Sequence, residues 1–163
     1  MRPCGAFYGR VQSRAMLINH RFVYWGLVLF LAALLTGLLL VAAPAFVANP
    51  RGVLAGHLEA AMNGMFLIIV GLFFDRLRLS ERQAAWTRGL LLYGAFANWV
   101  FTTLAGILGT SGSTPLAGAG FQGSAAAEQF ILIGLVSVAL TTLGGVILLI
   151  VGARRGFAHP VVV

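Results

Sequence analysis

Four long apolar blocks, separated by short polar segments, dominate the pattern of residues along the chain. They cover residues 22–46, 53–74, 89–108 and 129–152. A helix rises about 1.5 Å per residue, so each block is long enough to cross the hydrocarbon core of a bilayer, which is about 30 Å thick. Alternation of apolar and polar residues, the mark of a half-buried strand, is missing. The pattern predicts an all-α integral membrane protein whose four helices form one bundle.

The polar segments predict where some helices begin and how closely they pack. Ser80-Glu81-Arg82-Gln83 is typical of a helix N-terminus, so we expect the third helix to begin before the membrane. Residues 109–127 are rich in Gly, Ser and Ala, which predicts a loop. The fourth block contains small residues of the kind that permit close helix packing, and the Leu-rich first block contains fewer, which predicts a more lipid-facing first helix. These small residues are Gly134, Ala139, Gly144 and Gly145.

Charge changes this picture by adding an orientation. Only 9% of residues are charged, against about a quarter in soluble domains, and the net charge is +7. The arginines flank the apolar blocks instead of forming one basic face, so they argue against nucleic acid as a partner. Outside the blocks they number four, one, four, none and two in chain order. By the positive-inside rule this predicts that both termini are cytoplasmic, as in a bacterial inner-membrane protein.

The same pattern divides the chain into a basic N-terminal arm at 1–21, a membrane domain at 22–155 and a C-terminal tail at 156–163. Ala43-Pro44-Ala45 resembles a signal cleavage site, but the apolar run before it is longer than the core of a signal peptide. Cys4 is the single cysteine, so an intrachain disulfide is excluded.

The second block contains three polar side chains where hydrocarbon is expected: His57, Glu59 and Asn63. Such groups are costly inside a membrane and mark candidate sites. Residues advance by 100° along a helix, so Glu59 and Asn63 share a face, whereas His57 and Asn63 lie about 120° apart. We therefore expect His57 and Asn63 to serve different roles.

Each polar residue also has a structural interpretation beside the functional one. For His57 the structural interpretation is a hydrogen bond to a carbonyl group or water, and the functional one is ligation of haem through one axial bond. Glu59 can be solvated near the membrane surface or paired with Arg51, and we expect it to be the least active of the three. Asn63 needs a partner, and the amide of Asn98 in the third block is the candidate. Tyr93 is interpreted as a core or interface aromatic, and Thr102 can bond its own helix.

Two motifs resemble those of the styrene oxide isomerases. His57 is followed by Met62-Asn63-Gly64-Met65 in the second block, and the third contains Gly94-Ala95-Phe96-Ala97-Asn98-Trp99-Val100-Phe101. The resemblance implies a trimeric membrane enzyme that rearranges an apolar epoxide to a carbonyl compound, with ferric haem b as the Lewis acid. It makes His57 the axial ligand of the haem iron, Asn63 a substrate-pocket residue and Asn98 the amide of the third helix.

The chain departs from the family pattern at two positions near the substrate. Gly94 or its neighbour Tyr93 stands where the family has an Asp, and Thr102 stands where it has a Tyr. Tyr93 and Thr102 are therefore candidate catalytic positions whose residue types point to a substrate other than styrene oxide. Two alternatives stay open: a haem-binding membrane protein without isomerase activity, and a haem-free accessory or transport subunit.

Overall fold

The computed structural model describes residues 19–42, 44–118 and 120–157, and this part of the chain consists of helices joined by short connections. The four long helices are α2 (His20–Ala42), α3 (Pro50–Phe73), α4 (Glu81–Leu108) and α5 (Ala125–Phe157). Two single 3₁₀ turns, η1 (Pro44–Phe46) and η2 (Phe74–Arg76), belong to the connections. All four long helices have the length and composition needed to cross a membrane, which confirms the predicted all-α membrane architecture.

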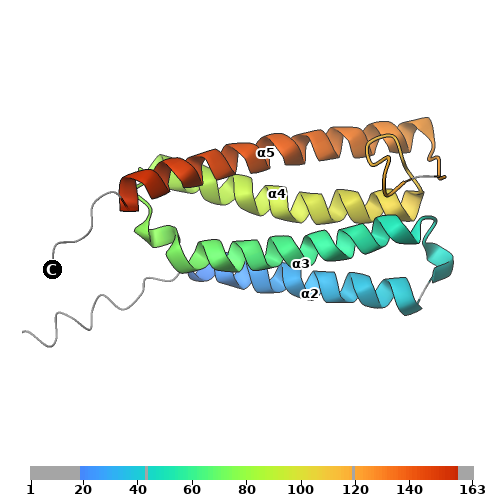
Figure 1. Ribbon diagram of the computed structural model, residues 1–163, viewed down its shortest axis with the longest axis horizontal. Helices are drawn as coiled ribbons and strands as arrows, with labels where there is room; N and C mark the ends of the chain where they lie inside the picture. The colour runs from blue at the N-terminus through green and yellow to red at the C-terminus, as the bar shows by residue number, and fades with distance from the viewer. Residues whose placement is uncertain (1–18, 43, 119, 158–163) are drawn as a thin grey trace, which may run out of the picture.

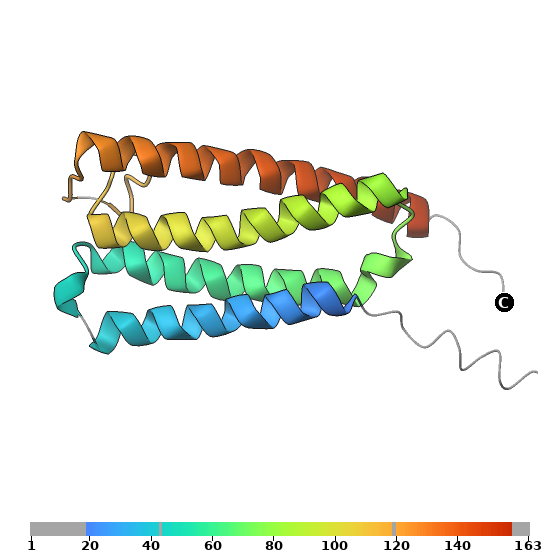
Figure 2. The same ribbon diagram turned by 180° about the vertical axis from the view of Figure 1, so that it is seen from behind.

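The helices run antiparallel, and each packs mainly on its neighbours in the sequence, α2 on α3, α3 on α4 and α4 on α5 (Figure 1). The start of α2, the turn after α3 and the end of α5 lie at one end of the bundle (Figure 2). Backbone bonds fix this end, since the amide of Arg78 donates to the carbonyl oxygen of Gly152 at 3.2 Å. Every described arginine except Arg51 belongs to segments at this end, as the positive-inside pattern requires.

Glycines set the distance between neighbouring helices. A Cβ at Gly64 of α3 would lie 2.8 Å from the carbonyl oxygen of Gly26 in α2. Gly106 of α4 meets the backbone of α3 in the same way, since a Cβ there would lie 2.6 Å from the carbonyl carbon of Gly52. Of the residues in each apolar span, 22% are buried in α2 and 22% in α5. The first helix is therefore no more lipid-facing than the fourth. Both are outer helices of the bundle, since α2 packs mainly on α3 and α5 mainly on α4.

Local capping explains where the helices begin and end. Ser80 and Gln83 form the predicted capping box, so α4 begins at Glu81 and not at the start of its apolar block. It ends at Leu108 and is capped by Gly109, whose φ of 66° is the left-handed conformation that glycine adopts at low cost. The first span was predicted to reach residue 46 but ends at Ala42, because Pro44 cannot continue the helix. Residues 1–18 and 158–163, and with them Cys4 and most of the predicted arm and tail, lie outside the described residues.

Candidate functional site

His57 faces α2. Its Nδ1 lies 2.7 Å from the carbonyl oxygen of Ala33, and a Cβ on Gly37 would lie 2.9 Å from the same ring nitrogen. A carbonyl oxygen only accepts, so Nδ1 carries the hydrogen and donates it. Nε2 of the neutral ring therefore keeps its lone pair, which is the form that ligates a metal. The half-buried ring is held rigidly by α2, with one nitrogen available for a ligand.

Glu59 faces α4 and takes part in a polar cluster with Thr102 and Asn98. The hydroxyl of Thr102 donates to Oε2 of Glu59 at 2.7 Å. Asn98 lies one helical turn before Thr102 on the same face of α4. Thr102 is 5% exposed and does not bond its own helix. Within the described chain no ion pair joins Glu59 to Arg51, and the carboxyl group of Glu59 accepts a hydrogen bond from Thr102 instead.

A groove of ≈ 440 Å³ lies between α3, α4 and α5, in the size range of small-molecule sites. Asn63 and Asn98 both line it, as predicted for a shared polar position, although no hydrogen bond between their two amides is found in the described residues. Gly94 contributes the α4 backbone. The rest of the lining comes from α5 and is mainly apolar: Val138, Ala139, Thr142, Leu143 and Val146. The groove can therefore hold an apolar body with one polar end.

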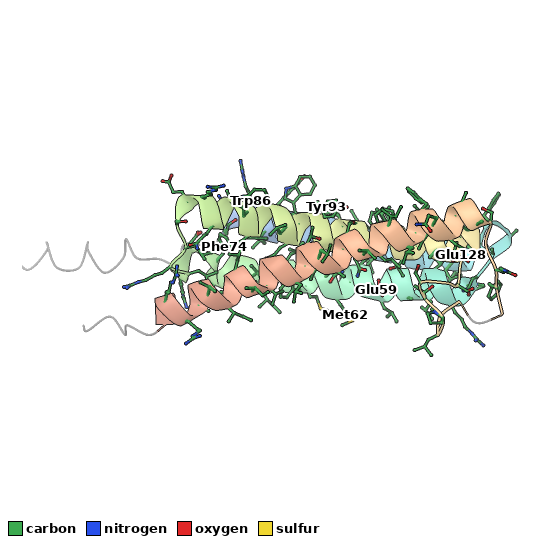
Figure 3. The ribbon with its side chains drawn as sticks, turned by 90° about the horizontal axis from the view of Figure 1, so that it is seen from above. Glu59, Met62, Phe74, Trp86, Tyr93 and Glu128 are labelled. Atoms are coloured by element: carbon green, nitrogen blue, oxygen red, sulfur yellow. The ribbon has the colours of Figure 1, made fainter. Side chains whose placement is uncertain are left out.

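Tyr93 lies away from this groove, although it is adjacent to Gly94 in the sequence. Its hydroxyl is 2.8 Å from Oγ of Ser137, and 47% of the residue is exposed. Seen from above, Tyr93 and Glu59 lie on opposite sides of the α5 ribbon (Figure 3). Of the two positions considered for the family's Asp, the structure thus places Gly94 at the groove and Tyr93 outside it.

Two contacts between helices could not be expected from the sequence. Thr142 lies on α5, opposite Gly94, and a Cβ on Gly94 would be 2.5 Å from its hydroxyl oxygen. Trp99 donates from Nε1 to Oγ1 of Thr36 at 2.9 Å and ties α4 to α2. Both contacts join residues on different helices, so no pattern within one helix could indicate them. Glu59 and Thr102, 43 residues apart, were missed as a pair for the same reason.

The side chains that could act as metal ligands limit the kind of metal centre that this chain can hold. No group of three or more His, Cys, Asp or Glu side chains comes together in the described residues, so a metal held by protein side chains alone lacks ligands there. Haem needs one axial ligand because the porphyrin supplies four nitrogens. His57, with its orientation fixed by Ala33, fits that requirement. Exposed leucines on the same two helices offer apolar contacts for a macrocycle: Leu34, Leu38, Leu54 and Leu58.

Comparison with known proteins gives matches over most of the chain. Residues 18–154 match the family model described as styrene oxide isomerase. The hydroxylaminobenzene mutase HabB of Ectopseudomonas oleovorans is 43% identical over 129 residues, which are 77% of this chain and 75% of that protein. The hydroxylaminobenzene mutase HabA of the same organism is 36% identical over 131 residues, 80% of this chain and 94% of that protein. No solved structure gives a significant match.

Proposed function

Because this chain belongs to the styrene oxide isomerase family, we propose that it is a membrane-embedded mutase that rearranges an arylhydroxylamine. The observation that carries the substrate class is the 43% identity to a hydroxylaminobenzene mutase over 77% of the chain. The groove supports it, since its apolar α5 wall suits an aryl ring and the amides of Asn63 and Asn98 suit a polar N–O group.

The proposed reaction is balanced without an oxidant or reductant. The N–O bond of the arylhydroxylamine breaks, with both electrons leaving on oxygen, and the hydroxyl oxygen forms a bond to a ring carbon. The carbon loses one proton and the nitrogen gains one, so the product is an aminophenol of unchanged mass. The amide of Asn63 stabilises the oxygen as negative charge develops on it, while the apolar walls limit access of water to the reactive cation.

Haem b is part of this proposal, with His57 as the residue that holds it. When bound, ferric haem supplies a Lewis acid that withdraws electron density from a substrate oxygen. The contribution of the chain is the orientation of the imidazole: the carbonyl oxygen of Ala33 accepts the Nδ1 hydrogen, so the lone pair stays on Nε2. Gly37 leaves room for the ring at this contact.

We further propose that the enzyme is a homo-oligomer, a trimer by the family resemblance, in a bacterial inner membrane with both termini cytoplasmic. His57 faces α2, whereas Asn63 lines a groove formed with α4 and α5. One chain therefore presents its candidate metal ligand and its groove on different sides of α3. A neighbouring chain that places its groove beside His57 would bring the two parts of the site together.

A second candidate function is rearrangement of an apolar aryl epoxide to an aldehyde. The match to the styrene oxide isomerase model over residues 18–154 favours it. The chemistry is related, because in both substrates a weak bond from oxygen to a neighbouring atom breaks and leaves a cation conjugated with the ring. An epoxide carries no N–H or O–H donor, however, so it would leave amide acceptors in the groove without partners.

Product analysis tests the proposal. The purified protein in detergent is incubated without oxygen or added reductant with hydroxylaminobenzene and, separately, with styrene oxide, and the products are separated by chromatography and identified by mass spectrometry. We expect an aminophenol with the mass of the substrate, at a rate well above that in protein-free micelles. Aldehyde from styrene oxide with no aminophenol would support the epoxide function instead. Absence of both products, with haem bound, would refute both.

A further inference from the structure

Trp99 places an indole N–H donor within the membrane-spanning helix α4, and the partner of this donor lies on α2. Its Nε1 is 2.9 Å from Oγ1 of Thr36. A threonine hydroxyl has a single hydrogen, and Thr36 donates it to the carbonyl oxygen of Ala32 at 2.8 Å. An indole nitrogen donates and does not accept, so the direction of both bonds is fixed. Trp99 donates to Thr36, and Thr36 donates to Ala32.

These two bonds end beside the carbonyl group that holds His57. Ala32 precedes Ala33, whose carbonyl oxygen lies 2.7 Å from Nδ1 of His57. Ala33 and Thr36 are three residues apart, so they share a face of α2, and both are buried. This face is therefore bonded from two helices, by His57 on α3 and by Trp99 on α4. Because α2 is an outer helix that packs mainly on α3, the bond from Trp99 restrains it from a second side.

The position of α2 determines which ring nitrogen of His57 carries the hydrogen. The ring packs directly on the α2 backbone, since a Cβ on Gly37 would lie 2.9 Å from Nδ1. A shift of α2 by about 0.5 Å would lengthen the bond from Nδ1 to Ala33 beyond the usual range. The tautomer of a neutral imidazole is set by the hydrogen bonds that its nitrogens make. Without the bond to Ala33, the hydrogen can move to Nε2, and Nε2 then loses its lone pair.

We propose that Trp99 is a positioning residue for His57. Its hydrogen bond to Thr36 keeps α2 where the carbonyl oxygen of Ala33 holds the hydrogen on Nδ1. The use of the Nε2 lone pair as a haem ligand rests on the proposed function, whereas the tautomer does not. Asn98, the neighbour of Trp99, lines the groove. One turn of α4 thus contributes to the groove through Asn98 and to the orientation of His57 through Trp99.

Nitrogen NMR of the haem-free full chain in detergent tests this role directly. The histidine rings are labelled with ¹⁵N and measured at alkaline pH, where they are neutral and where protonated and unprotonated nitrogens give separate signals. The signals of His57 are those missing from His57→Gln. Trp99→Phe removes the N–H donor and keeps an aromatic ring, Thr36→Val removes the hydroxyl, and Thr36→Ser retains it. Trp86→Phe is the matched control, because Trp86 is on the same helix and is 58% exposed.

We expect His57 of the wild type to carry its hydrogen on Nδ1. In Trp99→Phe and in Thr36→Val the ratio of the Nδ1–H to the Nε2–H form should fall about five- to tenfold, the effect of one lost hydrogen bond. Thr36→Ser should stay within about twofold of the wild type, and Trp86→Phe should not change the ratio. The double variant Trp99→Phe/Thr36→Val should fall no further than Thr36→Val alone, because both changes remove the same bond between helices.

The ferric/ferrous midpoint potential of the haem-loaded protein gives a second measurement. A hydrogen bond from Nδ1 makes the imidazole a stronger electron donor, which favours the ferric state. The potential should therefore rise in Trp99→Phe and stay constant in Trp86→Phe.

An unchanged tautomer ratio in Trp99→Phe would overturn the inference and leave its hydrogen bond with the sole role of satisfying the indole N–H. Equal changes in Trp99→Phe and Trp86→Phe would also overturn it. If either Trp99→Phe or Thr36→Val does not fold, the other still decides the question. Failure of the proposed function is a different result: wild-type protein would bind no haem or form no aminophenol, while the tautomer of His57 would still depend on Trp99.

Discussion

Gly106 is the position where one added methyl group should separate the two helices that carry the polar cluster. In Gly106→Ala the new Cβ would meet the backbone nitrogen of Val53 and would lie 2.6 Å from the carbonyl carbon of Gly52. Ordinary carbon contacts begin at about 3.5 Å, so α3 and α4 must move apart by roughly 1 Å at this level. The hydrogen bond from Thr102 to Glu59, 2.7 Å long and one helical turn away, would then exceed the usual range.

Overpacking of this kind costs about 1–3 kcal/mol. Gly89 provides the matched control, since it lies on the same helix and a Cβ added there has no neighbour within 4 Å. At Gly89 the same substitution should stabilise the helix by about 0.5–1 kcal/mol. The two alanine variants should therefore differ by about 1.5–4 kcal/mol in the free energy of unfolding, with Gly106→Ala the less stable.

The assay is equilibrium unfolding in mixed detergent micelles, monitored by circular dichroism. Wild type, Gly106→Ala and Gly89→Ala are measured at the same protein concentration. Equal unfolding free energies for Gly106→Ala and Gly89→Ala would show that the helices do not approach each other this closely.

Three further predictions concern haem, the oligomer and the loop. His57→Ala should lose the Soret band of the purified protein, while His20→Ala, at the first residue of α2, should retain it. An unchanged band in His57→Ala would exclude His57 as the ligand. Co-expressed His57→Ala and Asn63→Leu chains should regain part of the activity that each variant lacks alone, because a mixed oligomer contains one intact site shared between two chains. If isolated mixed oligomers show no recovery, the whole site lies within one chain. Glu128→Ala should make the 109–124 loop more sensitive to protease than Glu81→Ala does, because Glu128 accepts backbone hydrogen bonds from Ser111, Gly112 and Gly123; equal cleavage rates would contradict this role.

The sequence was sufficient for the architecture because membrane helices leave a strong local pattern. Block length, the Ser80 capping box and the arginines each depend on residues close together in the chain. The 120° separation of His57 and Asn63 was likewise predictable, since it follows from helix geometry alone. In the structure His57 faces α2, whereas Asn63 lines the groove with α4 and α5, as expected.

The candidate site was predictable only in part, because its contacts join different helices. The hydrogen bond between Glu59 and Thr102 was not predicted, although each residue was considered by itself. The distance of Glu59 from Arg51 is short along the sequence, whereas its distance from Thr102 becomes short only when α3 packs on α4. The apolar wall of the groove comes from α5, whose residues differ little in type from those that face lipid.

The decisive question is whether the reaction depends on the groove between α3, α4 and α5. The rate of aminophenol formation from hydroxylaminobenzene is measured for wild type, Asn63→Leu and Thr87→Val at equal helical content. Thr87→Val is the control, because the Thr87 hydroxyl bonds its own helix at the carbonyl oxygen of Gln83 and Thr87 does not line the groove. We predict that kcat/KM falls about tenfold or more in Asn63→Leu, because a hydrogen bond to the developing charge is lost in a site of low polarity, and that it is unchanged in Thr87→Val. Full activity in Asn63→Leu would mean that the groove is not the active site and that the chemistry takes place elsewhere in the molecule.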